Sequence, residues 1–290
     1  MPDRPRVSVL MPVLDPHPVY FPEAVQSILQ QTFSDWELII VEEPSSGPAV
    51  KDLLPDKSDP RIRVQTHPHR TSLVQQRNRG LEQARGELIA WLDADDVAEP
   101  HRLAEQVAFL DRHPEIAVLG SQIKIIDASG GLIGVRRYPL SHEEIVRCLR
   151  RFSPLAHPAV MFRRAAVLEA GAYQYEELPA GEDYELWCRM AQRGYRFANH
   201  SGELLRYRLH GEAFKVKRLR PLLLSTTEIK RRYFQGQFDW GDRLRLWGER
   251  LLLLLPPTWV YRLFVWHAVK PVPHSAVRSA TPEKAEEKLA

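Results

Sequence analysis

Short apolar runs alternate with segments of helical periodicity along most of the chain. Runs rich in Val, Ile and Leu predict strands that are buried on both faces, and apolar residues spaced three or four apart predict amphipathic helices. The predicted strands are 7–13, 36–41, 61–65, 88–92, 116–126, 132–135, 159–162 and 204–209, and the predicted helices are 23–31, 72–84, 100–113, 141–150, 182–193 and 212–235. This alternation predicts an α/β fold with a mostly parallel sheet and helices on both faces.

One predicted strand ends abruptly in acidic residues. The apolar run 88–92 is followed by Asp93, Asp95 and Asp96. Open α/β sheets bind ligands at the carboxyl ends of their strands, and clustered carboxylates repel one another unless they share a cation. Oxygen ligands suit Mg²⁺ or Mn²⁺, which usually bind together with phosphates. An acidic loop that caps the next helix, with Asp95 or Asp96 as the N-cap, explains this stretch equally well.

The charge of the chain is unevenly distributed. Its 290 residues carry a formal net charge of +3, which is too small to indicate a nucleic-acid partner. Residues 196–250, however, contain thirteen Lys or Arg and six Asp or Glu. This excess fits phosphates or an anionic membrane surface, and it fits a solvated helix face at least as well.

Cysteine usage and the first residues indicate a cytoplasmic location. Cys148 and Cys188 are far apart and form no disulfide or zinc pattern, which is typical of a reducing compartment. The first residues, 1–6, lack the apolar core of a signal peptide.

The carboxyl-terminal part of the chain has a different composition. Five leucines at 251–255 precede Pro256-Pro257 and the aromatic stretch 259–266. These breaks, together with Arg262, exclude a membrane-spanning helix. We favour a segment in the membrane interface beside the basic helix, on the inner face of the plasma membrane, over packing on the domain or on a second copy of the chain. We therefore predict an α/β domain at 1–210, a helical, partly apolar extension at 211–273 and a disordered tail at 274–290.

Four motifs occur in a recognisable order. They are Val7-Ser8-Val9-Leu10-Met11-Pro12-Val13, Arg77-Asn78-Arg79-Gly80-Leu81, Leu92-Asp93-Ala94-Asp95-Asp96 and Gly181-Glu182-Asp183-Tyr184-Glu185-Leu186-Trp187. With this order and spacing, residues 7–210 resemble glycosyltransferase family 2. A single DxD motif carries far less information than the ordered set. The resemblance implies the Rossmann-like GT-A fold and an inverting transfer from a nucleotide-sugar.

The resemblance also implies a donor site. Its residues would be Pro12, Val13, Glu42, Glu43, Arg77, Asp93, Ala94, Asp95 and Arg206. Asp95 would be the ligand of Mn²⁺ or Mg²⁺, and His210 would approach the same metal and diphosphate. Glu42 or Glu43 falls where the family usually has an Asp that contacts the nucleobase or ribose, so this position departs from the family pattern.

The acceptor side is implied in the same way. Asp183 matches the catalytic base with Glu182 beside it, and His157 matches a His near the acceptor. A metal can take up charge on a leaving diphosphate, and a carboxylate can accept the proton of a hydroxyl. One base without a covalent intermediate gives inversion. Outside the family pattern, acids at 182–183 are simply favourable at a helix start.

We therefore expect sugar transfer to a hydroxyl of a saccharide or lipid-linked acceptor in bacterial surface-polysaccharide assembly. A nucleotidyltransferase acting on sugar phosphates is an alternative, but it would need a Gly-rich loop after the first strand, and residues 15–18 contain no glycine. A non-catalytic module that binds nucleotide-sugars is the second alternative, and the intact Asp95 and Asp183 argue against it.

Overall fold

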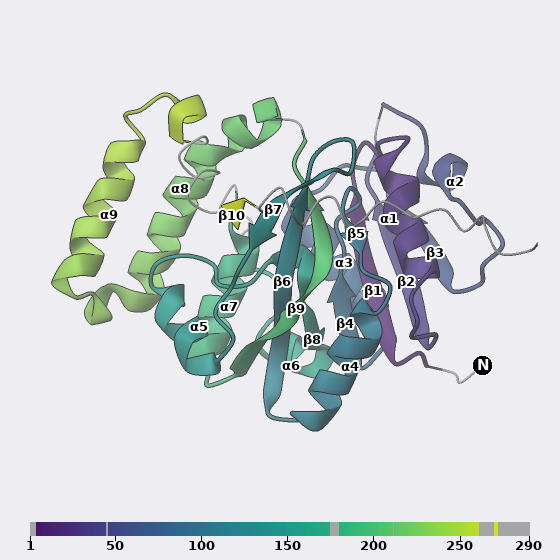
Figure 1. Cartoon of the computed structure of the whole chain (residues 1–290), viewed down its shortest axis with the longest axis horizontal. Coiled ribbons are helices and arrows are strands. Elements are labelled where there is room, and N and C mark those ends of the chain that lie inside the picture. The colour runs from purple at the N-terminus through teal and green to yellow at the C-terminus, as the bar shows by residue number, and fades with distance from the viewer. Residues whose placement is uncertain (1–3, 45, 175–179, 211, 261–269, 272–290) are drawn as a thin grey trace, which may run out of the picture.

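The computed structural model describes residues 4–44, 46–174, 180–210, 212–260 and 270–271. Within them lies a ten-stranded sheet with the order β10-β7-β6-β8-β4-β1-β2-β3, in which β9 pairs with β6 and β5 (Figure 1). The strands are β1 Val7–Val13, β2 Trp36–Glu42, β3 Ile62–Thr66, β4 Leu88–Trp91, β5 Val97–Ala98, β6 Ile116–Ile126, β7 Leu132–Arg136, β8 Met161–Arg163, β9 Arg196–Arg208 and β10 Lys270–Pro271. The helices are α1 Tyr20–Leu29, α2 Val50–Leu53, α3 Leu73–Gln83, α4 Arg102–Arg112, α5 His142–Leu149, α6 Arg164–Glu169, α7 Glu182–Gln192, α8 Glu212–Phe234 and α9 Trp240–Leu252, with the short 3₁₀ turns η1 His157–Ala159 and η2 Gln235–Gln237.

The sheet is parallel in its first half and mixed in its second. Strand β1 pairs in parallel with β2 and β4, and β2 pairs in parallel with β3. Strands β6 and β7 form the predicted hairpin, which can only be antiparallel, and β8 is antiparallel to both β4 and β6. The α/β class is confirmed, and the parallel arrangement predicted for the sheet holds for β1 to β4 and for the long pairing of β6 with β9.

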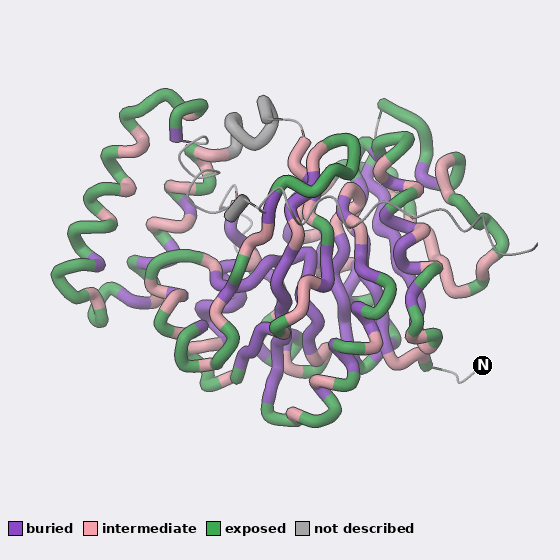
Figure 2. The backbone as a smooth tube through the Cα atoms, viewed as in Figure 1, coloured by how far each residue is buried: buried purple, intermediate pink, exposed green. Residues whose placement is uncertain are grey.

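Apolar residues alternate between the two faces of the sheet. In β2, Leu38 and Ile40 join one core cluster, whereas Ile39 and Val41 join the other. Helices α1 and α4 cover the first face, and α3 and α5 to α8 cover the second. The central strands are therefore buried on both sides, as Figure 2 shows along the centre of the molecule, whereas β3 and β7 are only partly buried. Helices cover both faces, as predicted.

Several element boundaries differ from the predictions. Helix α1 begins at Tyr20 rather than at residue 23, and β9 begins at Arg196 rather than at residue 204. The middle of β9 is polar, so apolar runs do not predict it. This part of the strand is stabilised by its long pairing with β6. Helix α4 has His101 as its N-cap, so neither Asp95 nor Asp96 caps it. The capping interpretation of the acidic stretch is thus wrong.

The carboxyl-terminal extension contains α8 and α9, and β10 returns to pair with β7. In the part of the chain that the structure describes, no helix is long and apolar enough to cross a membrane. Most of the aromatic stretch 259–266 and all of 274–290 lie outside the described residues. The interfacial position of that stretch, the disorder of the tail and the domain boundaries remain predictions.

A close backbone approach at Gly86 makes the first prediction. A Cβ at this position would lie 2.5 Å from the backbone nitrogen of Ser8 and 2.9 Å from the carbonyl carbon of Val7. Gly86→Ala should therefore lower the free energy of unfolding by about 1–3 kcal/mol, the usual cost of overpacking, measured by urea denaturation. Gly47→Ala is the control because nothing lies within 4 Å of its added Cβ. Equal stability of the two variants would contradict the predicted clash.

Candidate active site

The acidic loop after β4 brings three carboxylates together. Asp93, Asp95 and Asp96 each offer an oxygen, and these atoms lie within 4.8 Å of one another. The loop follows a strand that pairs with β1, and its turn is closed by a hydrogen bond of 3.2 Å from the Asp96 backbone N–H to the Asp93 carbonyl. The carboxylates therefore lie at the carboxyl edge of the parallel strands, where α/β sheets bind ligands.

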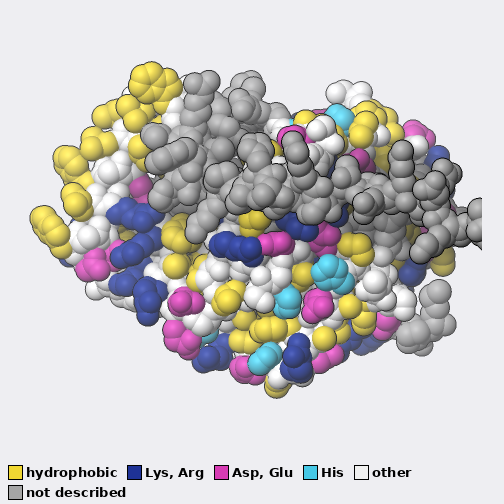
Figure 3. Space-filling model, viewed as in Figure 1, with side chains coloured by type: hydrophobic (Ala, Val, Ile, Leu, Met, Phe, Trp, Pro, Cys, Tyr) yellow, Lys and Arg dark blue, Asp and Glu magenta, His cyan; other side chains and the backbone are white. Residues whose placement is uncertain are grey.

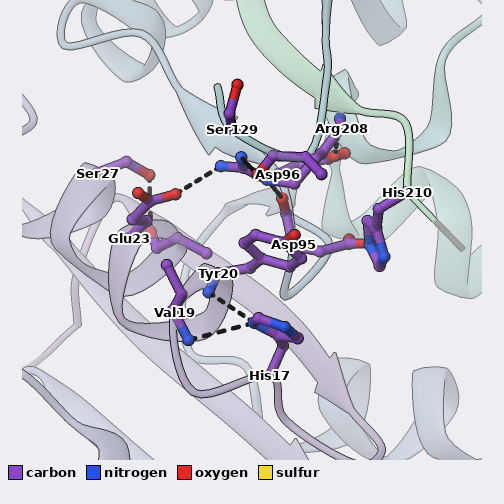
Figure 4. Close-up of polar contacts among 12 residues, drawn as sticks. His17, Val19, Tyr20, Glu23, Ser27, Asp95, Asp96, Ser129, Arg208 and His210 are labelled. Atoms are coloured by element: carbon purple, nitrogen blue, oxygen red, sulfur yellow. Dashed lines mark hydrogen bonds and ion pairs between the residues drawn. The ribbon is translucent and has the colours of Figure 1, made fainter. Parts of the chain in front are cut away.

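Arg208, at the end of β9, holds this loop in place. Its backbone N–H donates to Oδ1 of Asp96 and its Nε donates to the Asp95 carbonyl, both at 2.9 Å, while Nη2 forms a 2.5 Å ion pair with Glu23 of α1 (Figure 4). The side chain is buried. A buried arginine that joins three elements fixes the backbone that carries Asp95 and Asp96.

The donor site implied by the family resemblance includes Arg206 and not Arg208. The structure places Arg206 opposite Val97 of β5, where it forms an ion pair of 3.0 Å with Glu99. The two arginines are two residues apart on one strand and share a face, so alternation alone could not separate them. The donor-binding role of Arg206 remains a prediction, and Arg208 was missed.

Arg102 is a second missed residue. It lies in the first turn of α4, and its buried Nη2 donates to the carbonyl of Trp91, the last residue of β4, at 2.7 Å. Burial lowers its pKa to about 10, although Asp96 and Asp93 act in the opposite direction, so it stays charged at neutral pH. An arginine on the apolar face of a predicted helix was the sequence signal that could have identified it.

His210 reaches the acidic loop from beyond β9. Its Nε2 lies 2.5 Å from Oδ2 of Asp95. Its ring is 5.0 Å from that of Tyr20, which stacks on His17 at 3.8 Å, so the β1–α1 connection borders the same site (Figure 4). Carboxylate oxygens beside an imidazole nitrogen form a donor set that suits Mn²⁺ and, through its oxygens, Mg²⁺. The side chains present thus fit the predicted metal.

The first turn of α7 lies next to Arg77 of α3. Nη1 of Arg77 is 2.5 Å from Oε1 of Glu182, and the guanidinium lies over the rings of Trp91 and Tyr173 at 5.6 and 5.4 Å. Arg77 is buried, and Asp183 and Asp93 also stabilise its charge. Asp183, the predicted catalytic base, and Asp93 of the predicted donor site thus share one buried arginine.

Two carboxylates of this edge, Asp93 and Asp183, bind protons more tightly than usual. Burial, and after it the charge of Asp95, raise the pKa of Asp93 to about 6, and Arg77 offsets only part of this rise. Burial and the neighbouring Glu182 raise the pKa of Asp183 to about 6. Each shift reflects burial first and neighbouring negative charge second, and a bound cation would relieve the second.

His157 lies in an aromatic cluster beneath this edge. Its Nε2 is 2.8 Å from the hydroxyl of Tyr173, and its ring is 5.0 Å from the ring of Trp91. Burial, and then Arg77, lowers the pKa of His157 well below its usual value, so the imidazole is neutral. Its predicted position on the acceptor side is not tested by these contacts.

The residues that the resemblance places near the nucleobase lie at the ends of β1 and β2. Glu42 accepts hydrogen bonds of 2.7 Å from the Val50 backbone and the Thr66 hydroxyl, and Glu43 accepts two of 2.7 Å from Thr71. Both carboxylates thus order the loops around them. Gln76 of α3 donates to the carbonyls of Val13 and Val41, which fixes the strand ends beside Pro12. Contact of these residues with a nucleobase remains a prediction.

Because the pKa of Asp183 is raised, we predict that replacing its carboxyl group by an amide stabilises the protein at high pH. A carboxyl whose pKa is raised on folding stabilises the fold below about pH 4, and this contribution is lost as the pH rises through about 6. In EDTA at pH 8, Asp183→Asn should therefore raise Tm by roughly 2–4 °C, and the gap should narrow at pH 5. Glu143→Gln should give no such gain, since the pKa of Glu143 is lowered at its helix start. A Tm gap that is independent of pH would contradict this electrostatic account.

Comparison with known proteins connects this site to a family. The model of glycosyl transferase family 2 matches residues 8–171. The O-antigen biosynthesis glycosyltransferase WbnJ of Escherichia coli is 30% identical over 215 residues, covering 71% of this chain and 81% of its own. The E. coli UDP-Gal:alpha-D-GlcNAc-diphosphoundecaprenol beta-1,3-galactosyltransferase is 27% identical over 233 residues, covering 80% and 83%.

A solved structure agrees in fold. S. aureus TarS 1-349, in complex with UDP-GlcNAc, superimposes with a TM-score of 0.59 at 18% identity and covers 84% of this chain and 79% of its own. That likeness shows the GT-A fold predicted from sequence. Since the family model spans more than half of the 290 residues, the chain belongs to glycosyl transferase family 2 and is a glycosyltransferase.

Proposed function

We propose that the enzyme is an inverting, metal-dependent glycosyltransferase that moves a sugar from a nucleotide-sugar to a hydroxyl of a saccharide or lipid-linked acceptor. The observation that carries this proposal is the placement of two acidic groups at one edge of the sheet. Asp95 lies against His210, and Asp183 lies next to the pair formed by Glu182 and Arg77. Asp93 interacts electrostatically with both groups.

The donor side of this edge would hold a divalent metal. Asp95 and His210 are its proposed ligands, and Asp93 and the backbone of Ala94 would face the ribose and diphosphate. Bound Mn²⁺ or Mg²⁺ would supply Lewis-acid stabilisation of charge on the diphosphate. Arg208 contributes by holding the Asp95 backbone, and Arg206 remains a proposed diphosphate contact. Pro12 and Val13, with Glu42 and Glu43 behind them, would border the base.

The acceptor side would use Asp183 as the general base. The Asp183 carboxylate accepts the proton of the acceptor hydroxyl, whose oxygen then forms the new bond to the anomeric carbon as the bond to the diphosphate breaks. A pKa of about 6 leaves Asp183 charged at neutral pH yet more basic than an ordinary aspartate. Glu182 is already paired with Arg77, which makes it a positioning residue in this scheme.

The relatives narrow the substrate class. The name of one includes UDP-Gal and a diphosphoundecaprenol acceptor, and another acts in O-antigen biosynthesis. We therefore propose a UDP-sugar donor and an acceptor for surface-polysaccharide assembly, used at the cytoplasmic face of a membrane. Membership of family 2 favours glycosyl transfer over the two alternatives, nucleotidyl transfer and non-catalytic binding.

Loss of the metal should weaken binding of the nucleotide. Asp95→Ala, or EDTA with the unaltered enzyme, should reduce UDP affinity by about tenfold or more, because charge-assisted contacts to the diphosphate are lost, measured by calorimetry with Mn²⁺. Glu115→Ala is the control, since it lies before β6 at the opposite edge of the sheet. UDP binding that is insensitive to both EDTA and Asp95→Ala would remove Asp95 as a ligand.

The proposal that Asp183 is the general base makes a separate prediction. Asp183→Asn should cut turnover by about a hundredfold or more, the usual range for a lost general base, while UDP affinity stays nearly unchanged. Glu182→Gln should lose less, because it disturbs only the position of Arg77. Turnover can be followed by mass spectrometry of the product with a panel of UDP-sugars. If Glu182→Gln were the inactive variant and Asp183→Asn the active one, the two roles would be exchanged.

A further inference from the structure

Helix α9 packs on the protein through its polar side. The buried Asp242 carboxylate is 3.3 Å from Nε of Arg151 and 3.6 Å from Nη1 of Arg150, both just after α5. About two turns later, Glu249 accepts from the buried Lys230 of α8 at 2.7 Å. Both acidic side chains of this helix therefore point toward the body of the protein.

The opposite side of α9 is apolar and faces solvent. Trp240, Leu244, Trp247 and Leu251 follow one another at intervals of four, three and four residues, so they form one stripe along the helix. Their exposed fractions are 82, 65, 67 and 51%. Leu254 is also exposed just beyond the helix end. Figure 3 shows hydrophobic side chains along this outer edge of the molecule, with Lys and Arg side chains beside them.

The charges beside the stripe are positive. Arg243 and Arg250 are exposed, whereas the two acids of α9 are directed inward, where Glu249 pairs with both Lys230 and Arg245. A helix with Trp and Leu on one exposed face and arginines alongside it has the composition of helices that lie in the membrane interface. Anionic headgroups complement the arginines, and the acyl region accommodates the stripe.

We propose that the exposed stripe of α9, formed by Trp240, Leu244, Trp247 and Leu251, docks the enzyme on an anionic lipid bilayer. The stripe is distinct from the aromatic stretch 259–266 and lies wholly within the described residues. A second copy of the chain fits this surface less well. Two stripes facing each other would bring their flanking arginines together, and four side chains fall far short of the twenty or more residues per partner in a standard interface.

Vesicle binding by the full chain tests the inference. The unaltered protein should sediment with vesicles of equal parts phosphatidylcholine and phosphatidylglycerol, and only weakly with phosphatidylcholine alone. Trp240→Glu combined with Trp247→Glu should reduce the partition coefficient by about tenfold or more, since two large apolar side chains no longer leave water. The matched control is Leu132→Glu with Leu168→Glu, which adds the same charge at exposed apolar positions of β7 and α6.

Three results would overturn the inference. One is the absence of sedimentation of the unaltered chain, and another is an equal loss in the stripe variant and its control. The third is a concentration-dependent dimer, seen by analytical ultracentrifugation, that the stripe variant abolishes without any change in vesicle binding. Transfer to a short soluble acceptor without vesicles separates this inference from the proposed function. The stripe variant should keep that activity. If the proposed function were wrong, neither the unaltered chain nor the variants would transfer sugar, while vesicle binding of the unaltered chain would persist.

Discussion

The balance between clustered carboxylates and buried arginines at the end of β4 is the interaction on which this site depends. Asp93, Asp95 and Asp96 lie close enough to repel one another. Arg102 and Arg208 donate to the backbone carbonyls of Trp91 and Asp95, so their charges stabilise the loop, while His210 and the Arg208 backbone N–H contact the carboxylates of Asp95 and Asp96. The loop therefore keeps its shape and its negative potential, which are the two properties that a cation site requires.

The same balance joins the two halves of the site. Arg77 pairs with Glu182 at the start of α7 and also stabilises the charge of Asp93 after β4. Its guanidinium is buried beside the rings of Trp91 and Tyr173, where removing one partner of an ion pair is costly. The acidic loop and the first turn of α7 are thus held in a fixed relation, which a reaction with a leaving group on one side and a base on the other requires. The raised pKa values of Asp93 and Asp183 are the cost of this arrangement.

The carboxyl-terminal extension follows a different principle from the domain. Helix α8 places Ile229 and Phe234 in the core that covers one face of the sheet. Helix α9 is attached to the domain by ion pairs and leaves its apolar stripe in water. A helix that directs its acidic side chains inward and exposes two tryptophans gains nothing from that orientation in water alone.

Much of the fold could be predicted from the sequence because its causes are local. Apolar periodicity identified β1, β2, β4 and β6, and the Ser141–Glu144 capping box is present at the start of α5. The ordered motifs also identified the family. The sequence missed most of β9, because its polar middle is stabilised by pairing with β6, a partner about eighty residues away.

The site itself was only partly predictable. The motifs brought Asp95, His210, Arg77 and the acids of α7 into consideration, and the structure places them at one edge of the sheet. Arg206 and Arg208 are indistinguishable in the sequence, since they occupy the same face of one strand. Only the register of β9 against β5 and β6 decides that Arg206 meets Glu99 and that Arg208 meets the acidic loop. Hydrophobic periodicity thus determined where the chain forms strands and helices, whereas the partner of each buried charge was decided by tertiary contacts, because such pairing depends on distances between segments far apart in the chain.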